Sequence, residues 1–129
     1  MESVFKFIYD TIKGLEIDKC DIYLNRPTIL GDNERRKKSY VIISIPNGID
    51  NMGAFSKADG IITIGAKDAV LGLPQVNEIL RVANEIKKIF PTLTDDYSLI
   101  DLDFASDDSL GNGWHEYYYS FQIYINKSF

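Results

Sequence analysis

The stretch PQVNEILRVANEIKKIFP (residues 74–91) decides the fold that we expect for this chain of 129 residues. Its apolar side chains recur at steps of three and four residues, which brings them onto one face of a helix. Pro74 suits the first turn of a helix, and Pro91 ends one. We therefore predict an amphipathic helix over about residues 74–90. Its apolar positions are Val76, Ile79, Leu80, Ala83, Ile86 and Phe90.

Strand patterns lie on both sides of this helix in the sequence. Runs of alternating or β-branched residues predict strands at residues 20–25, 39–46, 60–67, 97–104 and 114–126. An apolar repeat predicts another helix at about residues 3–14. The connections between successive strands are short, apart from the one that holds helix 74–90. We therefore expect a single α+β domain over residues 1–129, in the order α-β-β-β-α-β-β. Its sheet should be mostly antiparallel, with about five strands and both helices on one face.

Alternation within the last two strands predicts which side chains share a face. In residues 97–104, Asp101 and Asp103 fall on one face with Tyr97 and Leu99. In residues 114–126, one face carries His115, Tyr117, Tyr119 and Phe121, and the other carries Glu116, Tyr118 and Tyr124. Gly65, inside an earlier strand, suggests a bulge or the close approach of another segment.

Composition excludes several classes of protein. Apolar residues make up 45% of the chain and charged residues 26%, which is typical of a globular domain and not of a disordered one. A single cysteine cannot form an internal disulfide, and no apolar run is long enough for a membrane helix. We also expect no secretory leader in this sequence. The net charge of −5 argues against general nucleic-acid binding, and one Cys with one His argues against zinc.

The charge is divided unevenly along the chain. Residues 1–67 carry ten basic and nine acidic side chains, whereas residues 68–129 carry four and ten. Seven acidic residues and no Lys or Arg lie between Asp95 and Glu116. The strongest basic run is Arg35, Arg36, Lys37 and Lys38. We interpret this run and the acidic residues Asp101, Asp103, Asp107 and Asp108 as solvated surface that can pair between neighbouring copies.

Two catalytic or metal-binding alternatives remain open at this stage. Asp101 and Asp103 are spaced to hold a hard cation, although the sequence lacks the spacing of a known calcium loop. Cys20 and His115 would make a nucleophile and base if the fold brought them together. We favour an acidic surface and a buried thiol instead. We therefore assign no catalytic residue, cofactor or metal.

The aromatic residues of the last strand are the most unusual feature. Tyr117, Tyr119 and Phe121 fit a core, while Tyr118 and Tyr124 lie on the opposite face. Tyr is enriched at protein interfaces, because it combines a large apolar ring with a polar tip. A stacking surface for single-stranded nucleic acid would need a positive groove, and the neighbouring charge is negative. We therefore predict that Tyr118 and Tyr124 belong to a protein interface.

The order of elements resembles that of a known family. A short helix precedes three strands, a strand ending in Gly-Ala-Lys-Asp (65–68) leads to one amphipathic helix, and Trp114-His115-Glu116 opens a long last strand. This is similar to the small tail-terminator and tail-completion proteins of tailed bacteriophages, also called head–tail joining or neck proteins. The likeness covers roughly residues 3–126 and rests on element order, size and the strand–helix unit from Ile61 to Phe90.

The resemblance implies a non-enzymatic structural protein of the virion, assembled in the host cytoplasm. Its partners would be copies of itself in a closed ring, often a hexamer, and other phage head or tail proteins. DNA would only pass through the ring, and no membrane would be involved. Cyclic symmetry uses contacts between two different patches, for which the basic run and the acidic stretch are candidates. The long final strand also offers an edge to a neighbour.

Two other classes compete with this interpretation. One is a small accessory or inhibitor protein that binds a single partner through its acidic, Tyr-rich sheet. The other is a metal-dependent enzyme that uses Asp101 and Asp103 with His115 and Glu116. In that arrangement Asp103 and Glu116 would be near neighbours across the last two strands.

Overall fold

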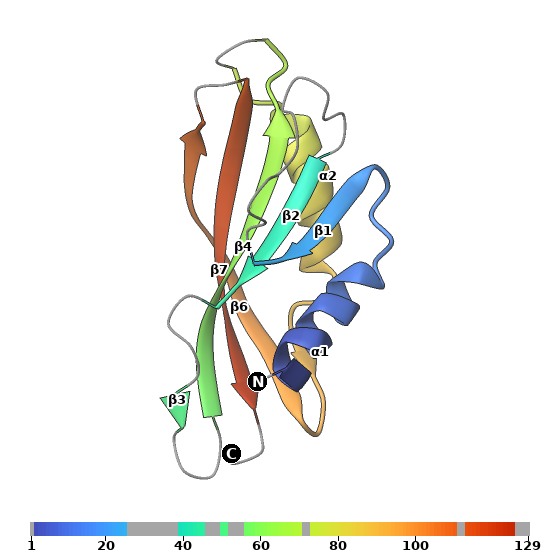
Figure 1. Cartoon of the computed structure of the whole chain (residues 1–129), viewed down its shortest axis with the longest axis vertical. Coiled ribbons are helices and arrows are strands. Elements are labelled where there is room, and N and C mark those ends of the chain that lie inside the picture. The colour runs from blue at the N-terminus through green and yellow to red at the C-terminus, as the bar shows by residue number, and fades with distance from the viewer. Residues whose placement is uncertain are drawn as a thin grey trace.

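The computed structural model describes residues 2–25, 39–45, 50–51, 56–70, 73–110 and 113–125. Two helices lie beside one curled sheet (Figure 1). In chain order the elements are α1 (Glu2–Lys13), β1 (Cys20–Leu24), β2 (Ser39–Ser44), β3 (Asp50–Asn51), β4 (Ser56–Lys67), α2 (Val76–Lys87), β5 (Thr92–Leu93), β6 (Tyr97–Ser109) and β7 (Trp114–Ile125). The predicted α+β class is confirmed. Neither described helix is long and apolar enough to cross a membrane.

The sheet differs from the prediction in size and direction. Among the described residues it has seven strands, six of them in the order β1-β2-β4-β7-β6-β5, and β3 pairs with β4. The expected mostly antiparallel sheet of about five strands is therefore only approximately right, because β1 and β2 run parallel. Two parallel neighbouring strands need a connection of about a dozen residues or more, because the chain must return to the end of the sheet where the first strand began. Residues 25–38, between β1 and β2, are long enough for this. The two extra strands, β3 and β5, have only two residues each.

One face of the sheet carries both helices and the main core. Ile8 and Ile12 of α1 are fully buried against it, as are Ile79 and Val82 of α2. The inward side chains of β2, β4 and β7 complete this core, among them Val41, Ile43, Ile62, Ile64, Phe121 and Ile123. Figure 1 shows both helices on the same side of the sheet, as expected from the order of elements.

β7 lies in the middle of the sheet, paired with β4 on one side and β6 on the other. Its predicted alternation is confirmed, since Tyr119, Phe121 and Ile123 are buried in the main core. The expectation that this long final strand offers a free edge is wrong. The strand that lies near the margin is β6.

β6 departs from simple alternation. Its register against β7 shifts between Ile100 and Asp103, and again between Phe104 and Ser106. Each shift places one extra residue on β6, which is a β-bulge. Leu99 and Leu102 consequently both pack in the main core, although the sequence pattern put them on opposite faces. The strand also continues to Ser109, beyond the predicted end at residue 104.

Gly65 confirms the predicted close approach. A Cβ atom at this position would lie 2.1 Å from Cζ of Tyr40. Gly60 makes room in the same way for the ring of Phe121 on the helix-bearing face, where a Cβ would lie 2.2 Å from Cζ. Each glycine of β4 thus permits an aromatic ring to lie directly on the backbone.

Candidate interaction surface

β6 forms one margin of the sheet over much of its length. β7 pairs with its inner side as far as Ser109, whereas β5 reaches its outer side only at Ser98 and Leu99. Beyond Leu99 no strand in the described part of the chain lies against this outer side. Every side chain from Asp103 to Asp108 is exposed. We call residues Asp103–Asp108 the β6 edge; it ends at the arrowhead in the upper left of Figure 1.

The four predicted acidic interface residues all lie on β6 and are all exposed. The first β-bulge separates Asp101 from Asp103, and Asp101 has a left-handed backbone with φ 57°. Asp107 pairs with Tyr117 and Asp108 with Glu116. Because paired residues point to the same face, these two consecutive carboxylates lie on opposite faces of the sheet. β6 contains no Lys, Arg or His to neutralise them.

The prediction that Asp103 and Glu116 are near neighbours across the last two strands is wrong. The last two strands do pair, but Asp103 lies opposite Ser120, and Glu116 lies opposite Asp108. Four residues of extended strand separate the two positions on β7, which is about 13 Å. His115 and Glu116 also point to opposite faces. The four residues of the enzyme alternative are therefore not brought together.

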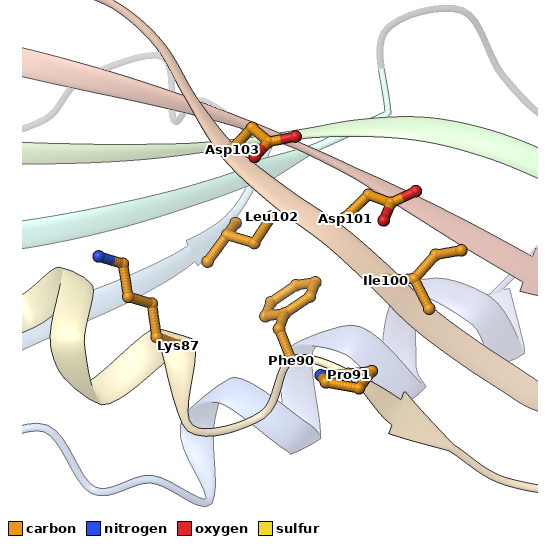
Figure 2. A pocket seen from close by; sticks show the side chains of 7 residues that line it. All are labelled: Lys87, Phe90, Pro91, Ile100, Asp101, Leu102 and Asp103. Carbon is orange, nitrogen blue, oxygen red and sulfur yellow. The ribbon is translucent and has the colours of Figure 1, made fainter.

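An open pocket of about 620 Å³ lies between the end of α2 and β6. Figure 2 shows Phe90 and Leu102 pointing into it, with Lys87 at one end. The carboxylates of Asp101 and Asp103 point away from these apolar side chains. A smaller pocket of about 260 Å³ is lined by both of these Asp residues, by Asp59 and by the polar side chains Ser120 and Gln122.

Carboxylates near these pockets are not arranged as metal ligands. Across the described ranges, no three His, Cys, Asp or Glu side chains are grouped closely enough to hold a metal ion. Asp101 and Asp103 therefore form an acidic rim beside an apolar hollow. Such a surface suits a positively charged protein segment better than an anionic ligand.

α2 covers only part of the helix-bearing face. One side of the helix is attached to the β1 margin, where Arg81 donates to the backbone oxygen of Asp18 (2.9 Å) and to Glu78, and Ser39 donates to Glu78 (3.1 Å). The hydrogen bond from Arg81 is the main reason that the pKa of Glu78 lies below its usual value. The other side of α2 carries Leu80, which is 43% exposed.

Apolar side chains also lie exposed on the uncovered part of this face. Phe104 of β6 is 54% exposed, and its ring contacts those of Tyr117 and Tyr119 with centroids 5.8 and 5.6 Å apart. Val76 and Leu80 lie on the same side of α2 as Lys87, which reaches the pocket beside β6. The acidic β6 edge therefore borders an apolar surface. Exposed apolar surface with a polar rim is typical of protein interfaces.

The burial of Glu116 is the feature that the sequence pattern predicted least well. It is only 1% exposed, although its neighbours on the strand suggested an open polar face. The hydroxyl of Tyr40 donates to one carboxylate oxygen at 2.5 Å, and that of Tyr118 donates to the other at 2.8 Å. Trp114 stacks against Tyr40, with ring centroids 5.7 Å apart. The sequence feature that pointed to this buried cluster was Gly65, because the absence of a side chain there leaves room for the Tyr40 ring.

The two tyrosines predicted at an interface have different surroundings. Both lie on the face without helices and both are half-buried. Tyr118 orients the Glu116 carboxylate, and so has a structural role within the chain. Tyr124 pairs with Lys57 and Ser98 on the neighbouring strands. Arg35, Arg36, Lys37 and Lys38 lie outside the described residues.

Cys20 and His115 do not form a pair. Cys20 is on β1 and His115 on β7, and β2 and β4 separate them by about 14 Å. Burial raises the pKa of the Cys20 thiol to about 12, so the thiol stays protonated at neutral pH. His115 is buried and its Nδ1 lies 2.5 Å from Oδ1 of Asp68. This contact, which the sequence did not predict, joins the end of β4 to the start of β7.

Comparison with known proteins adds no family to these observations. No protein-family model matches the chain, and no curated protein matches it either.

Proposed function

We propose that this chain is a structural subunit of the head–tail junction or tail terminus of a tailed bacteriophage, where it acts by forming a ring. The proposal starts from the resemblance in element order. The strand–helix unit on which the resemblance rests is present as β4 followed by α2. No catalytic role is proposed, because the residues considered for one lie on different strands and faces.

The β6 edge is the observation that carries the proposal. A strand edge left unpaired by its own sheet presents N–H and C=O groups to another chain. The opposite margin of the sheet is β1, which pairs only with β2 among the described strands. A subunit whose sheet has two different margins among the described strands suits head-to-tail contacts, and these generate a closed ring when the rotation closes.

The charge of the chain also suits this role. Its net charge of −5 disfavours adhesion to DNA, so a ring of such subunits would let DNA pass. The apolar surface around Phe104 and Leu80 would be covered by neighbouring subunits or by other head or tail proteins. Contacts of this kind would place the protein in the virion after assembly in the host cytoplasm.

Light scattering coupled to size exclusion tests the proposal. We expect one discrete ring-sized oligomer whose population grows with protein concentration. Raising the ionic strength from about 0.01 M to 1 M shortens the Debye length from about 30 Å to 3 Å, and should shift the population toward monomer if charge pairs hold the ring. A strict monomer over the whole concentration range, at both salt levels, would contradict ring formation in solution.

The main alternative is an accessory or inhibitor protein that binds one partner. It is favoured by the helix-free face of the sheet, where Tyr118 and Tyr124 keep part of their rings exposed. A monomer that binds a single protein, with binding lost in Tyr124→Ala and retained in Asp107→Asn, would support this alternative over the ring.

A further inference from the structure

Two exposed apolar side chains lie at the turn that precedes α2. Val70 is 64% exposed and Leu73 is 60% exposed. The backbone holds them together, since the N–H of Leu73 donates to the oxygen of Val70 (2.7 Å) and the N–H of Ala69 donates to the oxygen of Leu73 (3.0 Å). Val76 and Leu80 follow on α2, and both are 43% exposed. We call Val70 and Leu73 the apolar turn; exposed apolar side chains gathered in this way mark an interaction site.

The apolar turn lies too far from the pocket between α2 and β6 to fill it within one chain. The turn precedes Val76, where α2 begins, whereas the pocket lies beside Lys87, where α2 ends. At 1.5 Å per residue these two ends of the helix are about 17 Å apart. The turn and the pocket can therefore meet only when they belong to different copies of the chain. Contact between two different patches is the head-to-tail kind that generates a ring.

The pocket suits an apolar insert in both size and lining. Its volume of about 620 Å³ lies within the range of about 300–1,000 Å³ that holds a small ligand, so it has room for the side chains of a turn. Phe90 and Leu102 point into it (Figure 2), and both are half-buried. An apolar insert would remove these two side chains and its own from water, which is the dominant favourable contribution to most protein association.

The charges beside the two surfaces are complementary. Lys67, just before the apolar turn, is exposed and pairs with Trp114, so its side chain points to the face without helices. Asp103 pairs with Ser120, which lies on that same face of β7. Asp103 and Asp101 line the smaller pocket, and no Lys or Arg is among the described residues that line it. A copy whose apolar turn enters the larger pocket can therefore bring its lysine to the acidic side of β6.

We propose that the apolar turn of one copy of this chain inserts into the pocket between α2 and β6 of the next copy, with Lys67 against Asp101 and Asp103. This inference rests on the proposed ring and names the contact that holds it. Burial of Val70 and Leu73 supplies the affinity, and the charges beside them select the orientation of the two copies.

Disulfide cross-linking between two variants tests the contact directly. In a Cys20→Ala background, one chain carries Leu73→Cys and the other carries Leu102→Cys in the pocket. Oxidation of the assembled mixture should give a mixed dimer as the main product, and neither variant alone should cross-link. Lys87→Cys is a second pocket variant at an exposed position, for use if Leu102→Cys disturbs the fold. Leu24→Cys on β1 is the control partner for Leu73→Cys and should give at least about tenfold less product, because cysteines with Cα atoms more than about 7 Å apart do not form a disulfide.

Substitution of the apolar turn tests its contribution to affinity. Val70→Ser/Leu73→Ser should raise the concentration needed for half assembly by about tenfold or more, since the burial of two apolar side chains is lost. Both side chains are exposed in the single chain, so thermal unfolding of the monomer should change little. Leu24→Ser removes an exposed apolar side chain elsewhere and should leave assembly within about twofold of the unmodified chain. Unchanged assembly in Val70→Ser/Leu73→Ser would contradict the insertion.

A charge swap tests the orientation. Lys67→Glu and Asp103→Lys should each raise the concentration for half assembly by about fivefold or more, because like charges then face each other. The double variant Lys67→Glu/Asp103→Lys should regain most of the loss, since opposite charges meet again in every contact of the ring. Lys13→Glu makes the same change of charge on α1 and should alter assembly less than about twofold, because distant exposed charges are screened.

Each outcome decides a different point. An oligomer that gives no mixed cross-link with either pocket variant overturns this inference and leaves the ring standing. Cross-linking of Leu73→Cys with itself also overturns it, because two apolar turns would then pack together in a symmetric dimer. An unmodified chain that stays monomeric contradicts the ring and this contact together. The mixed cross-link, together with recovery in Lys67→Glu/Asp103→Lys, would support the contact.

Discussion

At the residue scale, glycine in β4 decides where an aromatic ring lies. The Tyr40 ring rests on Gly65, and from there its hydroxyl reaches Glu116. We expect Gly65→Ala to destabilise the fold by about 1–3 kcal/mol, because an inserted methyl forces the ring to move. Urea unfolding measures the loss. In a Tyr40→Ala background the same substitution should cost clearly less, since the clash is gone. Equal costs in both backgrounds would contradict the contact.

Glu116 provides a second test at this scale. Its carboxylate accepts hydrogen bonds from two tyrosine hydroxyls while almost completely buried. Glu116→Gln should destabilise the chain by about 1–3 kcal/mol, because buried hydrogen bonds to a carboxylate are stronger than those to an amide. Glu85→Gln is the matched control, since Glu85 pairs with Lys88 at the surface and should contribute less than about 0.5 kcal/mol. Similar losses in the two variants would disprove the buried network.

Cys20 shows how burial sets reactivity. Its thiol has a pKa raised from 9.0 to about 12, chiefly by desolvation. We expect iodoacetamide to alkylate the folded protein at least about a hundredfold more slowly at pH 8 than the urea-unfolded chain, because only the thiolate reacts. Comparable rates in the two states would contradict the burial of this thiol.

The same thiol adds a pH dependence to stability. The unfolded thiol loses its proton near pH 9, whereas the folded one keeps it until about pH 12. Between these values the unfolded state binds fewer protons, so the free energy of unfolding should fall as the pH rises. Cys20→Ala should remove this contribution, and unchanged slopes in urea unfolding above pH 9 would argue against it.

At the element scale, one side of α2 packs in the core and another side is exposed. Ile79 is fully buried against β4 and its neighbours, whereas the adjacent Leu80 is 43% exposed beside the uncovered sheet face. Ile79→Ala should cost about 2–5 kcal/mol in urea unfolding, and Leu80→Ala less than about 1 kcal/mol. If Leu80→Ala weakens assembly while leaving monomer stability almost unchanged, the exposed side of α2 belongs to the interface. Equal losses of monomer stability would place Leu80 in the core instead.

The buried face of a helix or strand could be predicted best where one periodicity holds along the whole element. α2 and β7 each follow a single periodicity from end to end. The prediction is right for Ile79, Ala83 and Ile86 of α2, whereas Val76 and Leu80 are exposed and Val82 is buried in their place.

β6 does not follow a single periodicity, because its first bulge reverses the alternation at Asp103 and Phe104 and its second bulge restores it from Ser106 onward. No local pattern in residues 97–109 marks those bulges. The mutual position of Asp101, Asp103 and Glu116 was therefore beyond reach of the sequence.

At the scale of the whole molecule, charge is separated along the chain. Residues 68–129 carry a net charge of −6, and four of their acidic side chains lie exposed on β6. Under dilute monomeric conditions we expect the midpoint of thermal unfolding to rise with salt, because screening reduces repulsion among these carboxylates. Asp107→Asn/Asp108→Asn should reduce this rise. An identical salt dependence in the two proteins would show that the repulsion lies elsewhere.

The sequence by itself determined the α+β class, the two helices, the five main strands and the inward face of β7. These depend on periodicity and on breakers such as Pro91, which act over a few residues. Only the tertiary structure decided that β1 runs parallel to β2, that β7 is internal, that no described strand pairs with the outer side of β6 beyond Leu99, and that Glu116 is buried. Strand order, bulges and burial arise from contacts between distant segments, and no local pattern records which segments meet.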